Sequence, residues 1–399
     1  MSSTGYFQYN LRTVIHSGYG SVIRVPALLQ GLGARRVLLI SDQGLKNVGI
    51  VDRVAATFDM PQSGTMPTLA AIYTDILPDA GSSNVNDCIA FARANAIDSI
   101  LAVGGGSVLD AAKAVKYALC HQLLDIAESL QAGIKMETWP EAQHMGIPHL
   151  AVPTTAGTGA EVSPAAVILN EEAGFKGGLV APFLDADIAV LDAQLTLGLP
   201  PGLTGSTGMD ALTHALEGVA SPNANPFSDA HSILAAQLIE QYLPKAVANG
   251  QDVEARTQMI NASCMAINGY VAALNATPVH NCSHAFGALY HVPHGDGNAV
   301  LLPIVMECLP ELYVGNAERL ANALNMAPNG KTGVDRLAEV IEKIRSLQRE
   351  IGCATDFSRW NVKEEDMEKI ITAVVNDPMA VFYPIPVEKI REITLKAIG

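Results

Sequence analysis

The sequence has few positive charges, few cysteines and no long apolar run. Its 25 Lys and Arg residues stand against 40 Asp and Glu residues, which gives a formal net charge of −15 at pH 7. This excess disfavours binding to nucleic acid or to an anionic membrane, because both are negatively charged. No uninterrupted apolar stretch approaches the roughly 20 residues that a membrane-spanning helix requires. The composition therefore favours a small neutral or cationic partner.

The six cysteines are scattered along the chain, and no two of them form a Cys-x-x-Cys pair. This pattern indicates reduced thiols rather than a disulfide framework, and reduced thiols are typical of the cytosol. The first residues also lack the basic and apolar segments of a secretory signal. We therefore expect a soluble cytoplasmic protein.

A chain of 399 residues with 49% hydrophobic content can form two cores. In the first half, short strand-like runs alternate with helical periodicity, which predicts a parallel sheet covered by helices on both faces. The runs cover residues 36–40, 70–76, 99–103, 149–152, 165–169 and 188–191. The second half is almost entirely helical in its periodicity, at residues 228–243, 255–271, 309–324, 334–351 and 386–397. We predict an α/β N-terminal domain with a Rossmann-like sheet over residues 1–198, and an all-helical C-terminal domain over residues 199–399.

Four of the ten histidines lie in one short segment of the second half. Thr277, followed by a proline, predicts a helix that begins with a capping hydroxyl, and Pro293 predicts the end of that helix. His280 and His284 then lie one turn apart on one face. Because His294 follows the break, the chain can turn it back toward His280. This arrangement allows two imidazoles to converge.

A second helix is predicted upstream, and it is amphipathic. Asp210, His214 and Glu217 share one face of it, opposite an apolar stripe. An Asp-x-x-x-His pair alone is mostly a surface pair, but its carboxylate and imidazole can also bind a divalent metal. With His280 and His294 it makes an Asp-His-His-His set, which suits iron(II), zinc, manganese or nickel.

Three consecutive glycines, Gly104, Gly105 and Gly106, stand where a buried strand turns into a helix. Glycine lets the backbone approach a phosphate closely, and a helix N-terminus offers free N–H groups and a positive dipole end. Ser107 and Asp110 predict a cap for this helix. The segment matches neither the dinucleotide fingerprint nor the P-loop, so a tight turn without a ligand is the alternative.

A similar loop follows the strand at residues 149–152. The hydroxyls of Thr154, Thr155 and Thr158 can donate to phosphate or ribose oxygens, although an ordinary polar loop would look the same. Asp42, at the carboxyl end of an early strand, can accept from an adenosine ribose 2′-hydroxyl and would repel a 2′-phosphate. The pattern is compatible with NAD as the cofactor.

Taken together, residues 104–113, 153–161, 208–218 and 280–299 resemble the signatures of the iron-dependent (group III) alcohol dehydrogenases. The resemblance runs in the same order across nearly the whole chain. It implies a dehydroquinate synthase-like architecture, with a metal and NAD(P) between a nucleotide-binding α/β domain and a helical domain. It also implies hydride transfer between a primary or secondary alcohol and NAD, and a homodimer or larger homo-oligomer.

The resemblance assigns individual roles. It implies that the metal ligands are Asp210, His214, His280 and His294, with iron(II) favoured and zinc as the alternative. His284 is then the catalytic residue, beside substrate and nicotinamide rather than on the metal. Lys176, which spacing does not single out, falls near the cofactor. The implied cofactor-binding residues are Asp42, Gly104, Gly105, Gly106, Ser107, Asp110, Thr154, Thr155, Thr158 and Lys176.

The sequence departs from the familiar pattern at Asn281, Cys282, Ala285, Phe286 and Asp296. These positions surround the expected substrate pocket, so they leave the substrate open but not the reaction class. Two other activities share the architecture, that of maleylacetate reductases and that of hydroxyacid-oxoacid transhydrogenases. A non-catalytic oligomer-forming or ligand-sensing protein is a third alternative, against which the intact ligand set argues.

Overall fold

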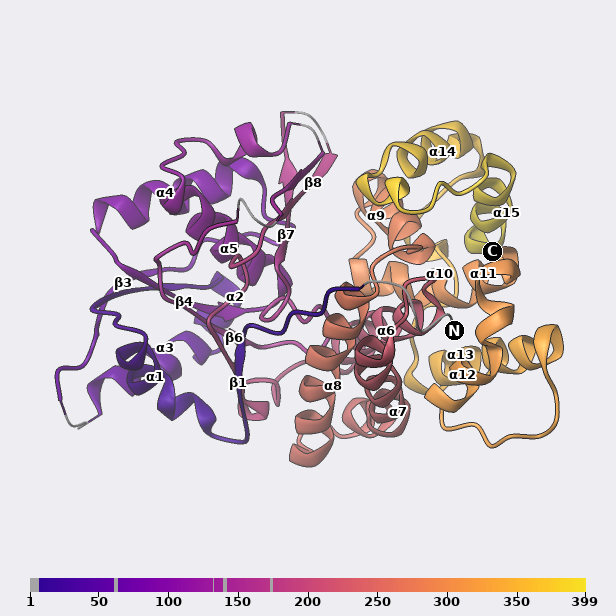
Figure 1. The fold of residues 1–399 in the computed structure, drawn as a ribbon, viewed down its shortest axis with the longest axis horizontal. Coiled ribbons are helices and arrows are strands. Elements are labelled where there is room, and N and C mark those ends of the chain that lie inside the picture. Colours follow the sequence, from indigo (N-terminus) through magenta and orange to yellow (C-terminus); the bar gives the residue numbers. More distant parts are fainter. Residues whose placement is uncertain (1–6, 61–63, 132, 139–141, 173–174) are drawn as a thin grey trace. The chain divides into compact units, whose positions relative to one another are not determined.

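The computed structural model describes residues 7–60, 64–131, 133–138, 142–172 and 175–399. The chain forms two compact units (Figure 1). The first, here called the sheet unit, consists of Leu11–Thr155 and Gly159–Leu197. The second, the helical unit, consists of Gly198–Gly399 together with Ala156–Thr158 and residues 7–10.

The sheet unit is built on six parallel strands in the order β1-β9-β6-β4-β2-β3. These strands are β1 (Val14–Ser17), β2 (Arg36–Ile40), β3 (Thr68–Tyr73), β4 (Ser99–Gly104), β6 (His149–Pro153) and β9 (Ile188–Leu191). The predicted parallel α/β sheet is therefore confirmed. The edge strand β1 was not predicted.

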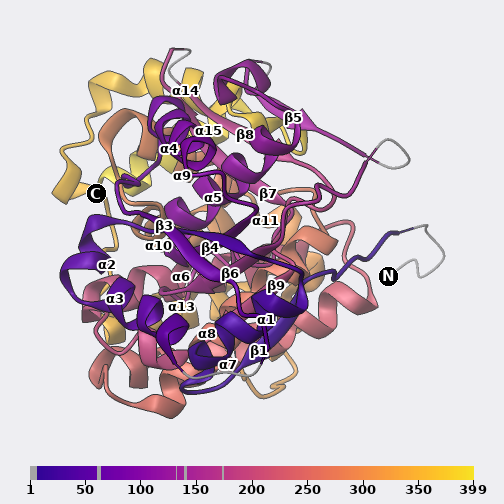
Figure 2. The ribbon, with the colours of Figure 1, turned by 90° about the vertical axis from the view of Figure 1, so that its left-hand side faces the viewer.

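Helices cover both faces of this sheet. On β2, Val37 and Leu39 belong to one buried cluster, whereas Leu38 and Ile40 belong to another, as the two-residue period of a strand requires. The first cluster includes side chains of α1 (Val25–Gly31) and α3 (Ile50–Ala55), and the second includes those of α4 (Ser82–Ala94) and α5 (Gly106–Cys120). Figures 1 and 2 show these two pairs of helices on opposite sides of the sheet.

A second, three-stranded sheet lies in the same unit. It consists of β5 (Ile134–Met136), β8 (Phe175–Val180) and β7 (Ala165–Asn170), in which β7 and β8 run antiparallel. The predicted strand at residues 165–169 thus lies outside the main sheet. Its partner β8 contains two glycines and a lysine, which hide it from a pattern of apolar alternation.

In the helical unit, α6 (Pro201–Ala220), α7 (Pro226–Ala248) and α8 (Val253–Ala272) pack side by side (Figure 1). A Cβ atom at Gly218 of α6 would lie 2.6 Å from Ser232 Oγ of α7, so glycine is needed for this approach. The helix predicted around Asp210 and His214 is present, but its polar face is buried as fully as its apolar face. Buried polar side chains require partners, which Asp210 finds in Asn298 and Glu217 finds in His280.

The remaining helices include α9 (Pro278–Tyr290), α10 (His294–Cys308), α13 (Gly333–Ile351), α14 (Met367–Asn376) and α15 (Val387–Ile398). The single helix predicted at residues 309–324 is instead two, α11 (Pro310–Tyr313) and α12 (Ala317–Ala323), with a 3-10 turn between them. Gly315 and Asn316 stand in this turn, and both residue types disfavour a helix interior. Among the described residues, no single helix is long and apolar enough to cross a membrane, although one bent pair, α10 with residues 310–323, meets those criteria together.

Candidate metal site and nucleotide loops

Three helices of the helical unit bring a carboxylate and two imidazoles together. Asp210 comes from α6, His280 from α9 and His294 from the first residue of α10. His291 ends α9 in the left-handed conformation with φ 55°, and the chain then passes through Pro293 into α10. This turn places His294 beside His280, with 5.4 Å between ring centroids.

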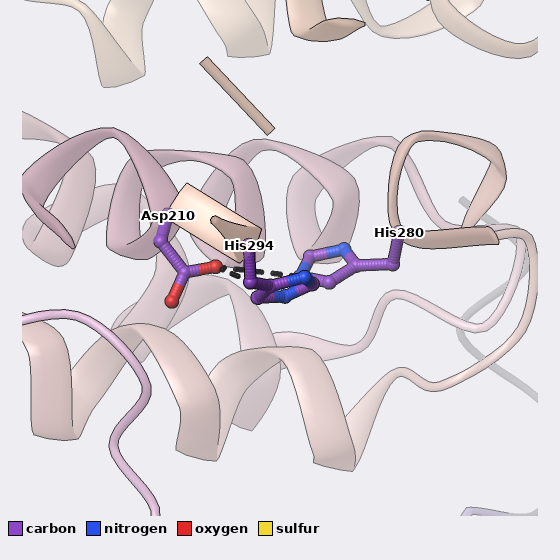
Figure 3. Close-up of side chains that lie close together, drawn as sticks. All are labelled: Asp210, His280 and His294. Carbon is purple, nitrogen blue, oxygen red and sulfur yellow. Dashed lines mark ion pairs between the residues drawn. The ribbon is translucent and has the colours of Figure 1, made fainter. Parts of the chain in front are cut away.

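The donor atoms of the three side chains face one another (Figure 3). His280 Nε2 lies 3.8 Å and His294 Nε2 lies 3.5 Å from Asp210 Oδ1. The set offers one ligand atom from each residue, all within 4.8 Å of one another. His280 Nε2 is buried and has no hydrogen-bond partner among the described residues. An unpartnered imidazole nitrogen beside a carboxylate fits a divalent metal ion.

His214 lies next to this group but not in it. Its ring stacks on that of His280 with 4.5 Å between centroids, and its buried Nδ1 finds no partner in the described part of the chain. Burial lowers the pKa of His214 to about 4, which keeps the ring neutral at physiological pH. A neutral imidazole is the form that binds a metal, so His214 has the right chemistry at a neighbouring position.

The electrostatics of the site favour positive charge. Burial alone would raise the pKa of Asp210, but the neighbouring imidazoles of His214 and His294 hold it well below the ordinary value. Burial likewise would lower the pKa of His280, but the charge of Glu217 raises it to about 9. A proton supplies this positive charge at His280, and a metal ion would supply it instead.

Two further polar side chains support the site: Asn298, which the sequence did not single out, and Glu217, which it placed on the face of Asp210 and His214 without a role. Asn298, fully buried and one turn beyond His294 on α10, donates from Nδ2 to Asp210 Oδ1 at 2.7 Å and lies 3.2 Å from His294 Nε2. Glu217 accepts from His280 Nδ1 at 2.5 Å. The one-turn spacing of His294 and Asn298 was a usable signal, whereas the pairing of Glu217 with His280 depends on the packing of α6 against α9.

His284 has a partner of its own far along the chain. Its Nδ1 lies 3.1 Å from Asp377 Oδ2, and its ring stacks on that of His294 at 5.4 Å. Asp377 is held in place because its Oδ1 accepts from the backbone N–H of Met379 at 2.8 Å. No motif in the sequence singles out Asp377.

The predicted start of α9 at Thr277 and Pro278 is confirmed, but two predicted capping side chains make no cap bond. Thr277 makes no side-chain cap of α9, where Pro278 in the first turn leaves fewer N–H groups to satisfy. Ser107 does not cap α5, because Gly105 is the N-cap and the helix begins at Gly106, two residues before the start that a Ser107 cap implies. The N-terminus of α5 therefore has no capping side chain, which leaves its N–H groups available to an anion.

The glycine loop itself is sterically constrained. A Cβ at Gly104 would lie 2.5 Å from the Val108 Cβ, and one at Gly105 would lie 3.3 Å from Thr155 Cγ2. The loop follows β4, and Asp42 follows its neighbour β2. The chain runs from β2 to β3 on one side and then to β4 on the other, so these two loops flank the switch point where nucleotides bind in parallel sheets.

The other predicted cofactor residues lie in varied surroundings. Asp42 caps helix α2 (Gln43–Asn47) by accepting from Leu45 N at 2.8 Å. Lys176 pairs with Asp79 at 2.7 Å, and the backbone N–H of Asp79 donates to Ser107 Oγ at 3.0 Å. These contacts bring Lys176 and Ser107 close together.

The remaining four are distributed between the units. Asp110 pairs with Lys113 at 2.8 Å and accepts from Val167 N at 3.1 Å. Thr154 and Thr155 follow β6 in the sheet unit, whereas Thr158 belongs to the helical unit.

Two family models match the chain in sequence order. Residues 12–193 match iron-containing alcohol dehydrogenase, and residues 204–398 match the C-terminal part of the Fe-containing alcohol dehydrogenase family. The chain is 33% identical over 355 residues to the long-chain-alcohol dehydrogenase 1 of Geobacillus thermodenitrificans, covering 89% of this chain and 87% of that protein. The chain belongs to the iron-containing alcohol dehydrogenase family.

Other members of this family are similar over nearly their whole length. The 1,3-propanediol dehydrogenase of Klebsiella pneumoniae is 34% identical over 383 residues, covering 95% of both proteins. A crystal structure of 1,3-propanediol oxidoreductase superposes with a TM-score of 0.87 at 32% identity, covering 99% of this chain and 100% of that one. An alcohol dehydrogenase from Oenococcus oeni superposes with a TM-score of 0.89 at 29% identity, covering 98% and 100%. The two-part fold is therefore that of the family.

Proposed function

We propose that this chain catalyses the reversible oxidation of a small primary or secondary alcohol to an aldehyde or ketone, with NAD as the hydride acceptor. The observation that carries the proposal is the convergence of Asp210, His280 and His294 around an unpartnered imidazole nitrogen, in a member of this family. Relatives are named for long-chain alcohols and for 1,3-propanediol. An aliphatic alcohol or diol is accordingly the proposed substrate.

Asp210, His214, His280 and His294 would hold the divalent metal, for which we propose iron(II) with zinc as the alternative. When bound, such a metal supplies Lewis-acid chemistry, which lowers the pKa of an alcohol hydroxyl. One carboxylate and three imidazoles suit both ions, and the name of the family favours iron.

We assign the proton transfer to His284. Because Asp377 engages Nδ1 of its ring, Nε2 is the nitrogen left to take up the proton released from the alcohol. Asp377 holds the ring in one orientation. The position of His284 against His294 keeps this base beside the proposed metal ligands.

We assign cofactor binding to the sheet unit and to Thr158. The glycine loop and the uncapped N-terminus of α5 would hold the pyrophosphate, because free N–H groups and the helix dipole favour an anion there. The Asp42 carboxylate would accept from the ribose 2′-hydroxyl and thereby favour NAD. The proposed set is completed by Ser107, Asp110, Thr154, Thr155, Thr158 and Lys176.

We also propose a functional boundary near residue 198, a homodimer or larger homo-oligomer, and a cytoplasmic location. All six cysteines are free thiols, which suits a reducing compartment. Strand β1 is an edge strand on which Val14 is 55% and Ile15 is 39% exposed, and an exposed apolar edge favours self-association. Sedimentation of the purified chain tests the oligomer, and a monomer at micromolar concentration would contradict it.

The metal assignment is tested with His214→Ala. This variant should lose bound metal and turnover but retain NAD binding, because the proposed nucleotide loops lie mainly in the other unit. Metal content per chain and NAD binding by fluorescence are the measurements. His231→Ala, which removes a half-buried imidazole of α7 that contacts the Tyr9 hydroxyl and the Phe227 carbonyl, is the matched control. Full activity and full metal content in His214→Ala would remove the ligand assignment.

The alternative activities are separated by one assay on iron-loaded protein kept free of oxygen. The proposal predicts NADH production from linear alcohols or diols that depends on both the metal and added NAD. Turnover without added free NAD would indicate a transhydrogenase, and activity independent of metal would indicate a maleylacetate reductase-like enzyme.

A further inference from the structure

Glu217 is a buried carboxylate with both oxygens engaged. Its Oε2 lies 2.5 Å from His280 Nδ1, and its Oε1 accepts from the backbone N–H of Val279 at 2.8 Å. The Glu217 side chain is 1% exposed. Removing a carboxylate from water is costly, so a glutamate at such a position needs a reason beyond filling space.

With these two hydrogen bonds, Glu217 can act toward His280 only as the acceptor of a proton carried on Nδ1. The backbone N–H of Val279 is always a donor, so it holds Oε1 and with it the orientation of the carboxylate. An ionised carboxylate only accepts, so Oε2 requires a proton on His280 Nδ1. Once a metal displaces the second proton of this ring, the neutral imidazole keeps its proton on Nδ1 and presents its lone pair at Nε2. Nε2 is the nitrogen that lies 3.8 Å from Asp210 Oδ1 and has no hydrogen-bond partner among the described residues.

We propose that Glu217 is the positioning residue of the metal site: it keeps the proton of His280 on Nδ1 and aims the Nε2 lone pair at the metal. This inference rests on the proposed metal site. Carboxylates that accept from the second nitrogen of a ligating histidine raise the basicity of that ligand and fix its ring. Here α6 supplies both the ligand Asp210 and, two turns later, the support for a ligand on α9.

The surroundings of Glu217 strengthen this effect. The ring of Tyr270 is buried and lies 5.0 Å from that of His280, and Tyr313 is buried as well. The Glu217 carboxylate, at 1% exposure, is therefore shielded from water. In such a medium a charged hydrogen bond is strong, and a partner that is lost is not replaced by solvent.

Glu217→Gln tests the proposal with almost no change in shape. Glutamine has a single oxygen acceptor, which the Val279 N–H claims, so the amide NH₂ group faces His280 Nδ1. An N–H donor at this position favours the ring tautomer that has its lone pair on Nδ1 and its proton on Nε2. In that tautomer Nε2 cannot bind the metal. We expect the affinity of the metal-free chain for Zn(II) or Co(II) to fall about 10- to 100-fold.

The measurement is competition with a chromophoric chelator, together with the visible spectrum of the Co(II) protein. Melting temperature and NAD binding should stay close to the parent values. In a His280→Ala background, Glu217→Gln should cause no further loss, because a residue that acts only through His280 has nothing left to position. Equal affinity of Glu217→Gln and the parent, or an equal loss in both backgrounds, would overturn the inference.

A second measurement needs no substitution at Glu217. In the zinc-loaded chain with ¹⁵N-labelled histidine, His280 should carry a slowly exchanging proton on Nδ1 and bind zinc through Nε2. Zinc on Nδ1, or an Nδ1 proton that exchanges as fast as those of exposed histidines, would also overturn it. If the parent chain bound no divalent metal at all, this result would instead contradict the proposed function, and not only the role of Glu217.

Discussion

Replacing Glu161 with glutamine should stabilise the sheet unit at neutral and alkaline pH. Glu161 follows the threonine-rich loop after β6 and is 2% exposed. Burial raises the pKa of its carboxyl from 4.5 to about 7, and the charge of Lys113 opposes this only in part. Because the folded state binds this proton more tightly than the unfolded state, the chain loses stability as the pH rises from about 4.5 to about 7.

The magnitude follows from the same pKa difference. About 2.5 pH units correspond to about 3 kcal/mol, at about 1.4 kcal/mol per unit. Glutamine has nearly the same shape and no charge, so Glu161→Gln should remove this penalty. In a domain of this size 1 kcal/mol moves the melting midpoint by about 2–4 °C, which predicts a gain of roughly 6–12 °C at pH 8. At pH 5 the expected difference is less than about 1 kcal/mol, because the buried carboxyl is then protonated.

Differential scanning calorimetry of the two proteins at both pH values is the assay. Glu172→Gln makes the same chemical change at an exposed position of the same unit and should leave both midpoints unchanged. The reasoning would be refuted by equal midpoints of Glu161→Gln and the parent at pH 8. A gain as large at pH 5 as at pH 8 would also refute it, because the cause could then not be the buried charge.

Three further changes test the two candidate sites. Asp42→Gly should bring the kcat/KM with NADP toward that with NAD. Asp42→Asn removes the charge but keeps an oxygen that can cap α2, so it tests the effect of the charge alone. An unchanged ratio of the two kcat/KM values in both variants would show that Asp42 does not select the cofactor. Asp377→Ala should lower kcat about 10- to 100-fold with little change in metal content, if it orients His284 as the base; unchanged kcat would remove this role. Gly295→Ala should reduce the metal content, because the added Cβ would lie 2.5 Å from the backbone oxygen of Ser206. Gly315→Ala is the control, since a Cβ there meets nothing within 4 Å. Equal metal content in the two variants would show that the close approach at Gly295 does not matter for the metal site.

The sequence predicted those parts of the fold that depend on local pattern. The strand at residues 36–40 has the observed bounds of β2, because an apolar run between turn residues is a local signal. Strand β1 was missed because it is a short edge strand. Its apolar residues Val14 and Ile15 are adjacent and largely exposed, so they do not produce the apolar–polar alternation of a half-buried strand. Strand β8 was missed because its glycines lie close to Leu130 and Ile134, a reason that only the packing reveals.

The same distinction between local pattern and long-range packing applies to the candidate metal site. Spacing placed Asp210 and His214 one turn apart on a helix and put His294 after a break, and both statements concern residues near one another in the chain. The contacts of His280 with Glu217 and of His284 with Asp377 join residues 63 and 93 positions apart. Such contacts depend on how whole helices pack, which periodicity does not describe. The two caps failed for different local reasons: α5 begins two residues before the position that a Ser107 cap implies, whereas α9 begins at Pro278 as predicted but Thr277 makes no side-chain cap bond.

The meeting of Asp210, His280 and His294 also bears on how the helical unit stays folded. A cation bound by all three would act as a cross-link between α6, α9 and α10, in a chain whose cysteines form no disulfide. Metal binding would then stabilise the native state by mass action. Removal of the metal by a chelator would destabilise α9 and α10 before it affected the parallel sheet. The supply of this cation would thereby bear on how long the helical unit stays folded, as well as on the proposed turnover.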